Sequence, residues 1–266
     1  MPNRALRTAA SGMYAQQLKI EVIANNIANI NTTSFKKNRA EFKDMMYQQV
    51  SANPQTENIP GIVENTTAKI QIGSGVKPSS SQKVFQQGDL QETGQQFDVA
   101  IYGEGFFQLR RPDGTYAYSR DGSFKVSGEG TLVTSDGLVL EPGISFNSDV
   151  TSLSISRDGV VSVKESTGDV IELGSIDLAK FVNPAGLLAL GDNLFEETKE
   201  SGVPLLGTPG SDGFGELHQG YLESSNVDIV EEMIAMIAAQ RAYEINSKTV
   251  KSVEDMMSIA NNLKQG

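Results

Sequence analysis

Residues that could do chemistry are scarce in this sequence of 266 residues, and histidine and cysteine set the first limits. The absence of cysteine excludes thiolate zinc sites, cysteine nucleophiles and disulfide scaffolds. The single histidine, His218, stands in Gly-Glu-Leu-His-Gln-Gly, and the chain has no Gly-x-Ser-x-Gly nucleophile elbow. Because one imidazole supplies only one ligand or one base, we expect no metal site and no catalytic triad.

Carboxylates are numerous, and a suitably spaced pair could hydrolyse a glycosidic bond. Tight turns already explain several of the aspartates, because Asp-Gly favours hairpin turns and each of these precedes a glycine: Asp113, Asp121, Asp136 and Asp158. The stretch 73–79 lacks the spacing of a phosphate loop, and Gly103-x-Gly105 lacks the third glycine of a dinucleotide site. We therefore predict no enzyme, no catalytic residues and no cofactor.

Charge and glycine divide the chain into two ends and a middle. The net charge is +4 over 1–45, −12 over 46–222 and −3 over 223–266, which totals −11, with a pI near 4.7. Such acidity argues against nucleic acid as a partner. The middle holds 24 of the 26 glycines, so the ends are expected to be helical and the centre is not.

The N-terminal end carries an apolar stripe with heptad spacing. Leu6, Met13, Ile20 and Ile27 recur every seven residues, and Ile23 falls three positions after Ile20. The asparagine-rich run 25–33 should end this helix, since Asn and Thr compete for backbone hydrogen bonds. Polar residues at 16, 17, 19 and 21 interrupt any signal-peptide core, so we expect no cleaved secretory signal.

The C-terminal end predicts one long helix after capping-box-like residues at 225–231. No Gly or Pro occurs between Tyr221 and Gln265, and a helix of about 36 residues would be about 54 Å long. Its stripe supplies the rest of the predicted assembly interface: Val230, Met233, Ile234, Ile237, Arg241, Ile245, Met256 and Leu263. The two stripes can pair within the chain as a coiled coil. We also expect them to pack against neighbouring subunits, since in a monomer part of their apolar surface would stay exposed to water.

The middle of the chain predicts short strands. Between residues 84 and 220, apolar runs are separated by turn signals at intervals of about ten, which is typical of all-β domains. The polar stretch 51–83 indicates an extended arm or long loop. No stretch is long and apolar enough for membrane insertion. The predicted fold class is α+β: a discontinuous helical coiled coil from 1–45 and 223–266, an arm over 46–83 that can form a β-hairpin, and a β-rich domain over 84–222.

Three blocks of sequence resemble one known family, the bacterial flagellar rod and hook axial proteins. They lie within 1–47, 88–124 and 220–248, and their motifs are Ala9-Ala-Ser-Gly-Met13, Asn25-Asn-Ile-Ala-Asn29, Gly88-Asp-Leu90, Asp98-Val-Ala-Ile101, Tyr118-Ser-Arg-Asp-Gly122, Gly220-Tyr-Leu-Glu223 and Gln240-Arg-Ala-Tyr-Glu244. The family usually has glycine where Ser34 stands. If that backbone needs a positive φ, Ser34 is strained.

The resemblance implies a structural subunit that polymerises into the distal rod, the drive shaft that transmits torque from motor to hook. Expected partners are further copies of itself in a helical homopolymer, proximal rod subunits, the hook protein, the surrounding ring bushing and the flagellar type III export apparatus. The expected location is the basal body, where the rod crosses the periplasm. A proximal rod subunit of similar size is the nearest alternative. A peptidoglycan-cleaving enzyme with paired carboxylates and a non-flagellar coiled-coil adhesin are less favoured.

Overall fold

The structure is a computed structural model that describes residues 2–51, 69–146, 150–165, 169–211 and 213–265. The chain forms two compact units, each built from separated segments. The helical unit comprises Met1–Ile27, Asn38–Gln82 and Ile229–Gly266, and the β unit comprises Ala28–Lys37 and Lys83–Asp228. The chain therefore passes between the units four times.

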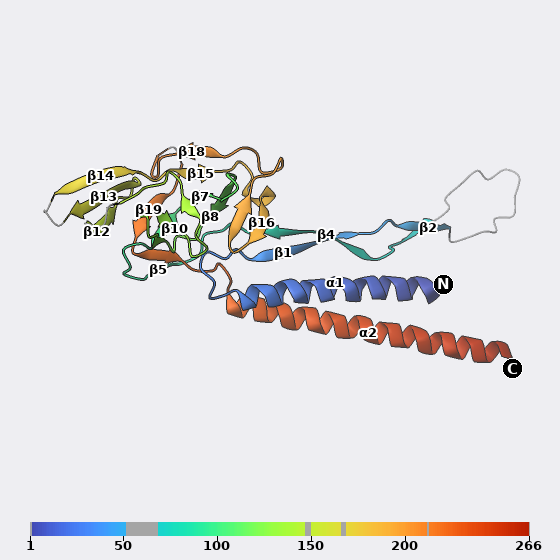
Figure 1. Ribbon diagram of the computed structural model, residues 1–266. Coiled ribbons are helices and arrows are strands. Elements are labelled where there is room, and N and C mark those ends of the chain that lie inside the picture. The colour runs from blue at the N-terminus through green and yellow to red at the C-terminus, as the bar shows by residue number, and fades with distance from the viewer. Residues whose placement is uncertain (1, 52–68, 147–149, 166–168, 212, 266) are drawn as a thin grey trace, which may run out of the picture. The chain divides into compact units, whose positions relative to one another are not determined.

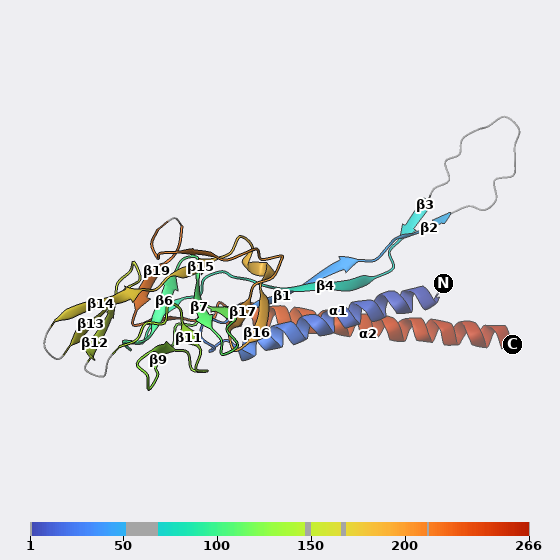
Figure 2. The same ribbon diagram turned by 45° about the horizontal axis from the view of Figure 1, so that its top comes forward.

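Two long helices, α1 (Pro2–Ala28) and α2 (Ile229–Gln265), lie side by side in the helical unit (Figures 1 and 2). The expected C-terminal helix is thus present over 37 residues. The N-terminal helix ends within the asparagine-rich run, where the Thr32 hydroxyl donates to the Asn29 side chain at 3.2 Å and the Thr32 N–H donates to the Asn29 carbonyl at 3.1 Å. Local side-chain bonds of this kind compete with helix continuation.

Paired strands complete the helical unit. β1 (Asn38–Asp44) pairs with β4 (Val76–Lys83), and β2 (Gln48–Ser51) pairs antiparallel with β3 (Lys69–Ile72) to form an arm. Residues 38–44, which the charge pattern grouped with a helical end, are therefore extended. They are held extended by pairing with β4, and Asn26 on α1 binds the first residue of the strand, since its amide accepts from the Asn38 N–H and donates to the Asn38 carbonyl, both at 2.9 Å.

The β unit is built from antiparallel ladders. Its largest sheet has the order β16 (Leu188–Gly191), β17 (Leu194–Glu196), β8 (Tyr116–Ser119), β7 (Phe106–Arg110), β11 (Val139–Leu140), β10 (Leu132–Val133) and β9 (Lys125–Val126). Beside β7 lies β15 (Leu178–Lys180), which also pairs with β18 (Leu205–Gly207). The single turn of 3-10 helix is η1 (Pro184–Gly186) among the residues described.

Three smaller sheets complete this unit. The first has the order β12 (Val150–Ile155), β13 (Val160–Glu165) and β14 (Val170–Ser175). The second joins β6 (Val99–Tyr102) to β19 (Glu216–Gln219), and the third joins β5 (Leu90–Glu92) to β20 (Tyr221–Glu223). The second and third sheets each pair a strand from the C-terminal end of the β unit's sequence with a strand near the N-terminal end of that sequence.

Strand alternation and aromatic size create the core of the β unit. A large cluster gathers inward residues from many strands, among them Phe107, Leu109 and Val161, which are inaccessible to solvent. A smaller aromatic cluster contains Phe106, Tyr118, Phe181 and Phe195, with rings 4.8–6.0 Å apart in edge-on pairs.

The predicted Asp-Gly turns are confirmed at three positions, between β7 and β8, between β10 and β11 and between β12 and β13. At Asp121 the expected hairpin is wrong, because the chain leaves β8 along a turn in which the Asp121 carboxylate accepts the Ser123 N–H at 3.0 Å. The same rule predicts a hairpin turn at the fifth Asp-Gly, residues 212–213, which lies partly outside the described residues.

Candidate assembly interface

Side chains that could do chemistry occupy structural positions. His218 lies on β19, with its ring 5.6 Å from that of Tyr102 and 6.2 Å from that of Tyr221. The Asp113 carboxylate accepts from the N–H and hydroxyl of Thr115 at 2.9 and 2.6 Å, which is a turn. Within the described part of the chain, no group of three or more His, Asp or Glu side chains could hold a metal ion.

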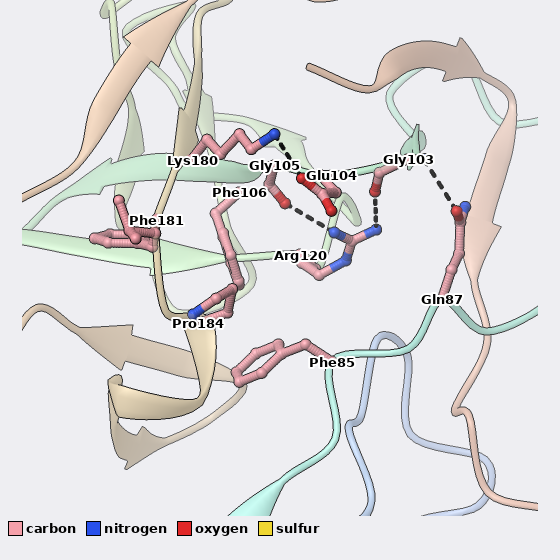
Figure 3. A pocket seen from close by; sticks show the side chains of 11 residues that line it. Phe85, Gln87, Gly103, Glu104, Gly105, Phe106, Arg120, Lys180, Phe181 and Pro184 are labelled. Carbon is pink, nitrogen blue, oxygen red and sulfur yellow. Dashed lines mark hydrogen bonds and ion pairs between the residues drawn. The ribbon is translucent and has the colours of Figure 1, made fainter. Parts of the chain in front are cut away.

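One hollow of about 430 Å³ opens on the β unit (Figure 3). Its apolar wall is formed by Phe85, Phe106, Phe181 and Pro184, and its other wall by residues that already bind one another. The Arg120 guanidinium donates to the carbonyls of Gly103 and Gly105, both at 2.9 Å. The polar groups of this wall thus brace the loop that joins β6 to β7.

The stripe on α1 is largely covered. Ile23 is buried, and four other predicted interface residues are half-buried: Leu6, Met13, Ile20 and Ile27. Two neighbours cover α1. The Ser11 hydroxyl accepts the N–H of Val76 at the start of β4 at 3.3 Å, and Gly12 faces α2, where an added Cβ would lie 2.9 Å from Asn246 Nδ2. Helix α1 is therefore packed between a strand ladder and α2.

The stripe on α2 is exposed. Every predicted interface residue of this helix lies in solvent: Val230, Met233, Ile234, Ile237, Arg241, Ile245, Met256 and Leu263. The exposed fraction of the aliphatic and methionine side chains among them runs from 52% to 79%. The side chains that α2 does bury are smaller or polar, namely Glu232, Ala239 and Val253. At about 100° per residue, these two sets lie on opposite sides of the helix.

The sequence therefore located the apolar residues of α2 but not the face that packs within the chain. That packed face is specified by polar contacts, of which the clearest is the Asn26 amide donating to the Glu232 carboxylate at 3.2 Å in a buried position. The large aliphatic side chains lie on the other side of α2, where they are exposed to solvent. An exposed apolar face of this length marks an interaction surface.

A buried ionic cluster was missed from the sequence. Glu223, at the end of β20, accepts from the Lys36 ammonium at 2.5 Å and from the Arg120 Nε at 2.8 Å. The N–H of Gly88 donates to the same carboxylate at 2.9 Å, and all three charged side chains are at least 96% buried. The carboxylate thus joins four segments of the β unit.

In this cluster of three charged side chains, Glu223 supplies the negative charge that balances Lys36 and Arg120. Burial raises the pKa of its carboxyl group, but the Arg120 and Lys36 cations and their hydrogen bonds more than offset this, so the pKa lies below its ordinary value. Burial lowers the pKa of the Lys36 ammonium to about 8, although Glu223 acts in the opposite direction and Arg120 adds to the lowering. The carboxylate is therefore charged at neutral pH, and burial of the lysine ammonium is only partly offset by its carboxylate partner.

The two chain segments that lead to the helices are bound to each other at this cluster. The N–H of Ser34 donates to the Glu223 carbonyl at 2.7 Å, and Asn226 accepts the N–H of Lys37 at 2.8 Å. The Asn226 amide also donates to the carbonyls of Val84 and Gln86. The only sequence signal for this cluster was that Lys36, Arg120 and Glu223 each fall inside one of the three family-like blocks.

Comparisons with known proteins decide the family. Three family models match in order: "Flagella basal body rod protein" over residues 6–36, "Flagellar hook protein FlgE/F/G D1 domain" over 100–163 and "Flagellar basal body rod FlgEFG protein C-terminal" over 218–263. A curated "Flagellar basal-body rod protein FlgG" of Borreliella burgdorferi is 52% identical, over 98% of this chain and 99% of that one. The chain belongs to the flagellar basal-body rod protein family.

More distant relatives carry the same description. The FlgG proteins of Caulobacter vibrioides and Bacillus subtilis are 45% and 39% identical, each over 98% of this chain and 99% of its own length. Among solved structures, the Helicobacter pylori flagellar hook protein FlgE2 matches 71% of this chain and 43% of its own, at 18% identity and a TM-score of 0.24. That last likeness is too low to support an argument about arrangement.

Membership settles the class of function. The chain is a structural subunit of the bacterial flagellar basal-body rod and not an enzyme. Such subunits assemble with one another and with other rod and hook components of the flagellum. Over the residues that the structure describes, no helix has the length and hydropathy to cross a membrane.

Proposed function

We propose that this chain polymerises into the distal part of the rod, as a helical homopolymer that carries torque from motor to hook. The family match over nearly the whole chain supports the assignment, because the relatives with high identity are all rod proteins of similar length. In this proposal α1 and α2 form a coiled coil that contributes to an inner tube. The β unit then forms the outer surface of the rod.

The exposed apolar face of α2 is the observation that carries the proposal. Exposed Val, Met and Ile side chains lie between Val230 and Ile245, and a second exposed apolar group, Met256 to Leu263, follows nearer the C-terminus. An exposed aliphatic face is unfavourable for a monomer in water, and burial of each such side chain contributes about 1.5–3 kcal/mol. We propose that a second copy of the chain covers this face. Contacts of different surfaces on identical copies form rings where the rotation closes and open helical arrays where it does not, and we propose the open array here.

The same proposal assigns partners and location. Proximal rod subunits lie at one end of the array and the hook protein at the other, with the ring bushing around the β unit. The assembled rod crosses the periplasm, and each chain reaches it through the flagellar type III export apparatus without cleavage of a signal peptide. These assignments are based on the family resemblance and on the acidic middle of the chain. Acidic side chains favour a surface with little nonspecific adhesion to the surrounding ring.

Electron microscopy of the purified chain, with an isosteric control, tests the proposal. We expect tubes with a central channel from the native chain and none from Ile237→Asp, because burying an unpaired carboxylate in an apolar contact costs several kcal/mol. Met13→Asp tests the α1 stripe, and because Met13 is half-buried within the single chain, its helix signal must first match that of the native chain. Asn261→Asp adds the same charge to an exposed position of α2 away from the apolar row, and it should assemble normally.

Circular dichroism separates an assembly defect from an unfolded helix. Ile237→Asp should retain the native helix signal as a monomer, because the side chain is 56% exposed in the single chain. Native tubes from both Ile237→Asp and Met13→Asp would contradict the proposed interface. Closed oligomers from the native chain would contradict the helical array.

A further inference from the structure

The buried cluster of Lys36, Arg120 and Glu223 has an unequal composition, since two cations share one carboxylate. The three residues are far apart along the chain, by 187 positions from Lys36 to Glu223 and by 103 from Arg120 to Glu223. The exposed fraction of each side chain is 4% or less. Each cation also donates to backbone carbonyls, Lys36 to Gln86 and Arg120 to Gly103 and Gly105, and neither has a second carboxylate partner among the described residues.

The consequence of losing the carboxylate follows from electrostatics. A buried charge without a counter-charge is strongly destabilising, and here removal of Glu223 would leave two like charges in one site. Their mutual repulsion is already felt in the intact cluster, where Arg120 lowers the pKa of Lys36. The native arrangement of segment 34–37, of Arg120 and of the backbone at Gly88 is therefore compatible with burial only when the carboxylate is present.

We propose that this cluster is a folding check, in which the β unit reaches its native packing only after Glu223 has joined Lys36 and Arg120. A chain is made from its N-terminus, so both cations are present long before Glu223. The larger core cluster also contains Leu217, and β19 and β20 pair with β6 and β5, so the same terminal segment supplies packing as well as charge. A partly made or partly delivered chain would then stay open.

The check concerns the single chain, and it goes beyond the proposed assembly function. Staying open before completion suits a chain that is exported unfolded, and this benefit rests on the proposed function. The folding behaviour itself does not rest on the proposed function. The experiment below is therefore made on the unassembled chain, and its failure would leave the rod assignment untouched.

A double-mutant cycle on the full chain tests the check. Urea unfolding is followed by tyrosine fluorescence and near-ultraviolet circular dichroism, since the chain has no tryptophan and Tyr118 is buried in the β unit. Glu223→Ala should reduce the equilibrium constant for folding at least about a hundredfold. Lys36→Met should destabilise the native chain but stabilise the Glu223→Ala chain, because there it removes a stranded cation. This reversal of sign is the diagnostic result.

An exposed ion pair of the β unit provides the matched control. The Lys180 ammonium lies 2.6 Å from the Glu104 carboxylate, with 32% and 72% of the side chains exposed. Lys180→Met and Glu104→Ala should give small shifts with only weak coupling between them, and Lys180→Met should not change sign in the Glu104→Ala background. This control shows what loss of a neighbouring but solvated pair does to the same unit.

Each other outcome has a defined meaning. If Glu223→Ala does not fold at all, recovery of the near-ultraviolet signal in the Lys36→Met/Glu223→Ala chain supports the check. A Glu223→Ala chain whose urea midpoint of unfolding equals that of the native chain overturns the proposal. So does a cycle in which Lys36→Met shifts the midpoint equally in both backgrounds, because the lysine would then act through packing alone.

Discussion

At the scale of single residues, Ser34 shows how a strained position is compensated. Its φ is +56°, in the left-handed region where a residue with a Cβ is disfavoured by about 1–2 kcal/mol. This agrees with the expectation from the family pattern, in which glycine usually occupies the position. The Ser34 hydroxyl donates to the Arg120 carbonyl at 2.8 Å and is buried. A hydrogen bond of this kind contributes about 0.5–1.5 kcal/mol, so it offsets most of the strain.

Two substitutions separate these contributions. Ser34→Gly removes both the strain and the bond, and we expect a change in the free energy of unfolding of less than about 1 kcal/mol. Ser34→Ala keeps the strain and leaves the Arg120 carbonyl without this donor, so it should destabilise by about 1–2 kcal/mol. Urea unfolding of the two variants checks the order. A Ser34→Ala chain as stable as the native chain would show that the hydroxyl does not compensate, and one as stable as Ser34→Gly would show that the position is not strained.

At the scale of elements, close approach of α1 and α2 depends on Gly12. A Cβ added there would lie 2.9 Å from the Asn246 side-chain nitrogen, which must then move. Alanine at a helix interior is otherwise favoured over glycine by about 0.8–1 kcal/mol. In the native chain we expect these effects to cancel for Gly12→Ala. In an Asn246→Ala background the overlap is gone, so the same substitution should stabilise by about 1 kcal/mol.

Thermal or urea unfolding at 222 nm measures this coupling, because the helices dominate the signal. The four chains of the cycle are native, Gly12→Ala, Asn246→Ala and the double variant. An identical effect of Gly12→Ala in both backgrounds would mean that Asn246 does not set the helix spacing. Leu or Val at position 12 should separate the helices in either background, since those side chains are larger than the space that Asn246 vacates.

The elements differ in how far the sequence could predict them. Both helices and the strand runs near Val99, Phe106 and Val160 followed from period and turn residues, because each pattern acts locally. Strands β1 and β4 did not, since polar stretches such as Val-Lys-Pro-Ser-Ser-Ser pair through a partner that lies far along the chain. The packed face of α2 was also hidden. Hydropathy ranks Ile237 above Ala239, yet Ala239 is the residue that the chain itself buries.

The ionic cluster illustrates the same limit at a longer range. Lys36, Arg120 and Glu223 look like ordinary surface charges, which is how isolated Lys, Arg and Glu residues most often occur. Only tertiary pairing across more than 100 positions shows that they are buried together. The three family-like blocks include the three positions, but spacing within each block did not indicate that they meet.

At the scale of the whole molecule, net charge opposes assembly while the apolar face of α2 favours it. Each chain carries −11, so two approaching copies repel, and the middle of the chain contributes most of that charge. The screening length falls from about 30 Å at 0.01 M salt to about 8 Å at 0.15 M. Polymerisation should therefore accelerate as salt rises over this range, with light scattering as the measurement. The opposite dependence is expected if attraction between unlike charges on neighbouring copies drives the contact.

A variant of reduced charge makes this prediction specific. Four exposed acids of the β unit can be replaced by glutamine without touching the ionic cluster, which lowers the net charge to −7: Glu92, Glu129, Glu172 and Glu197. This chain should polymerise faster than the native chain at 0.01 M salt and at a similar rate at 0.15 M, where screening already removes most of the repulsion. Ile237→Asp should stay monomeric at both salt concentrations, because screening cannot supply the lost apolar contact. Equal rates for the native and reduced-charge chains at low salt would place the barrier to assembly in folding or in the apolar contact rather than in charge.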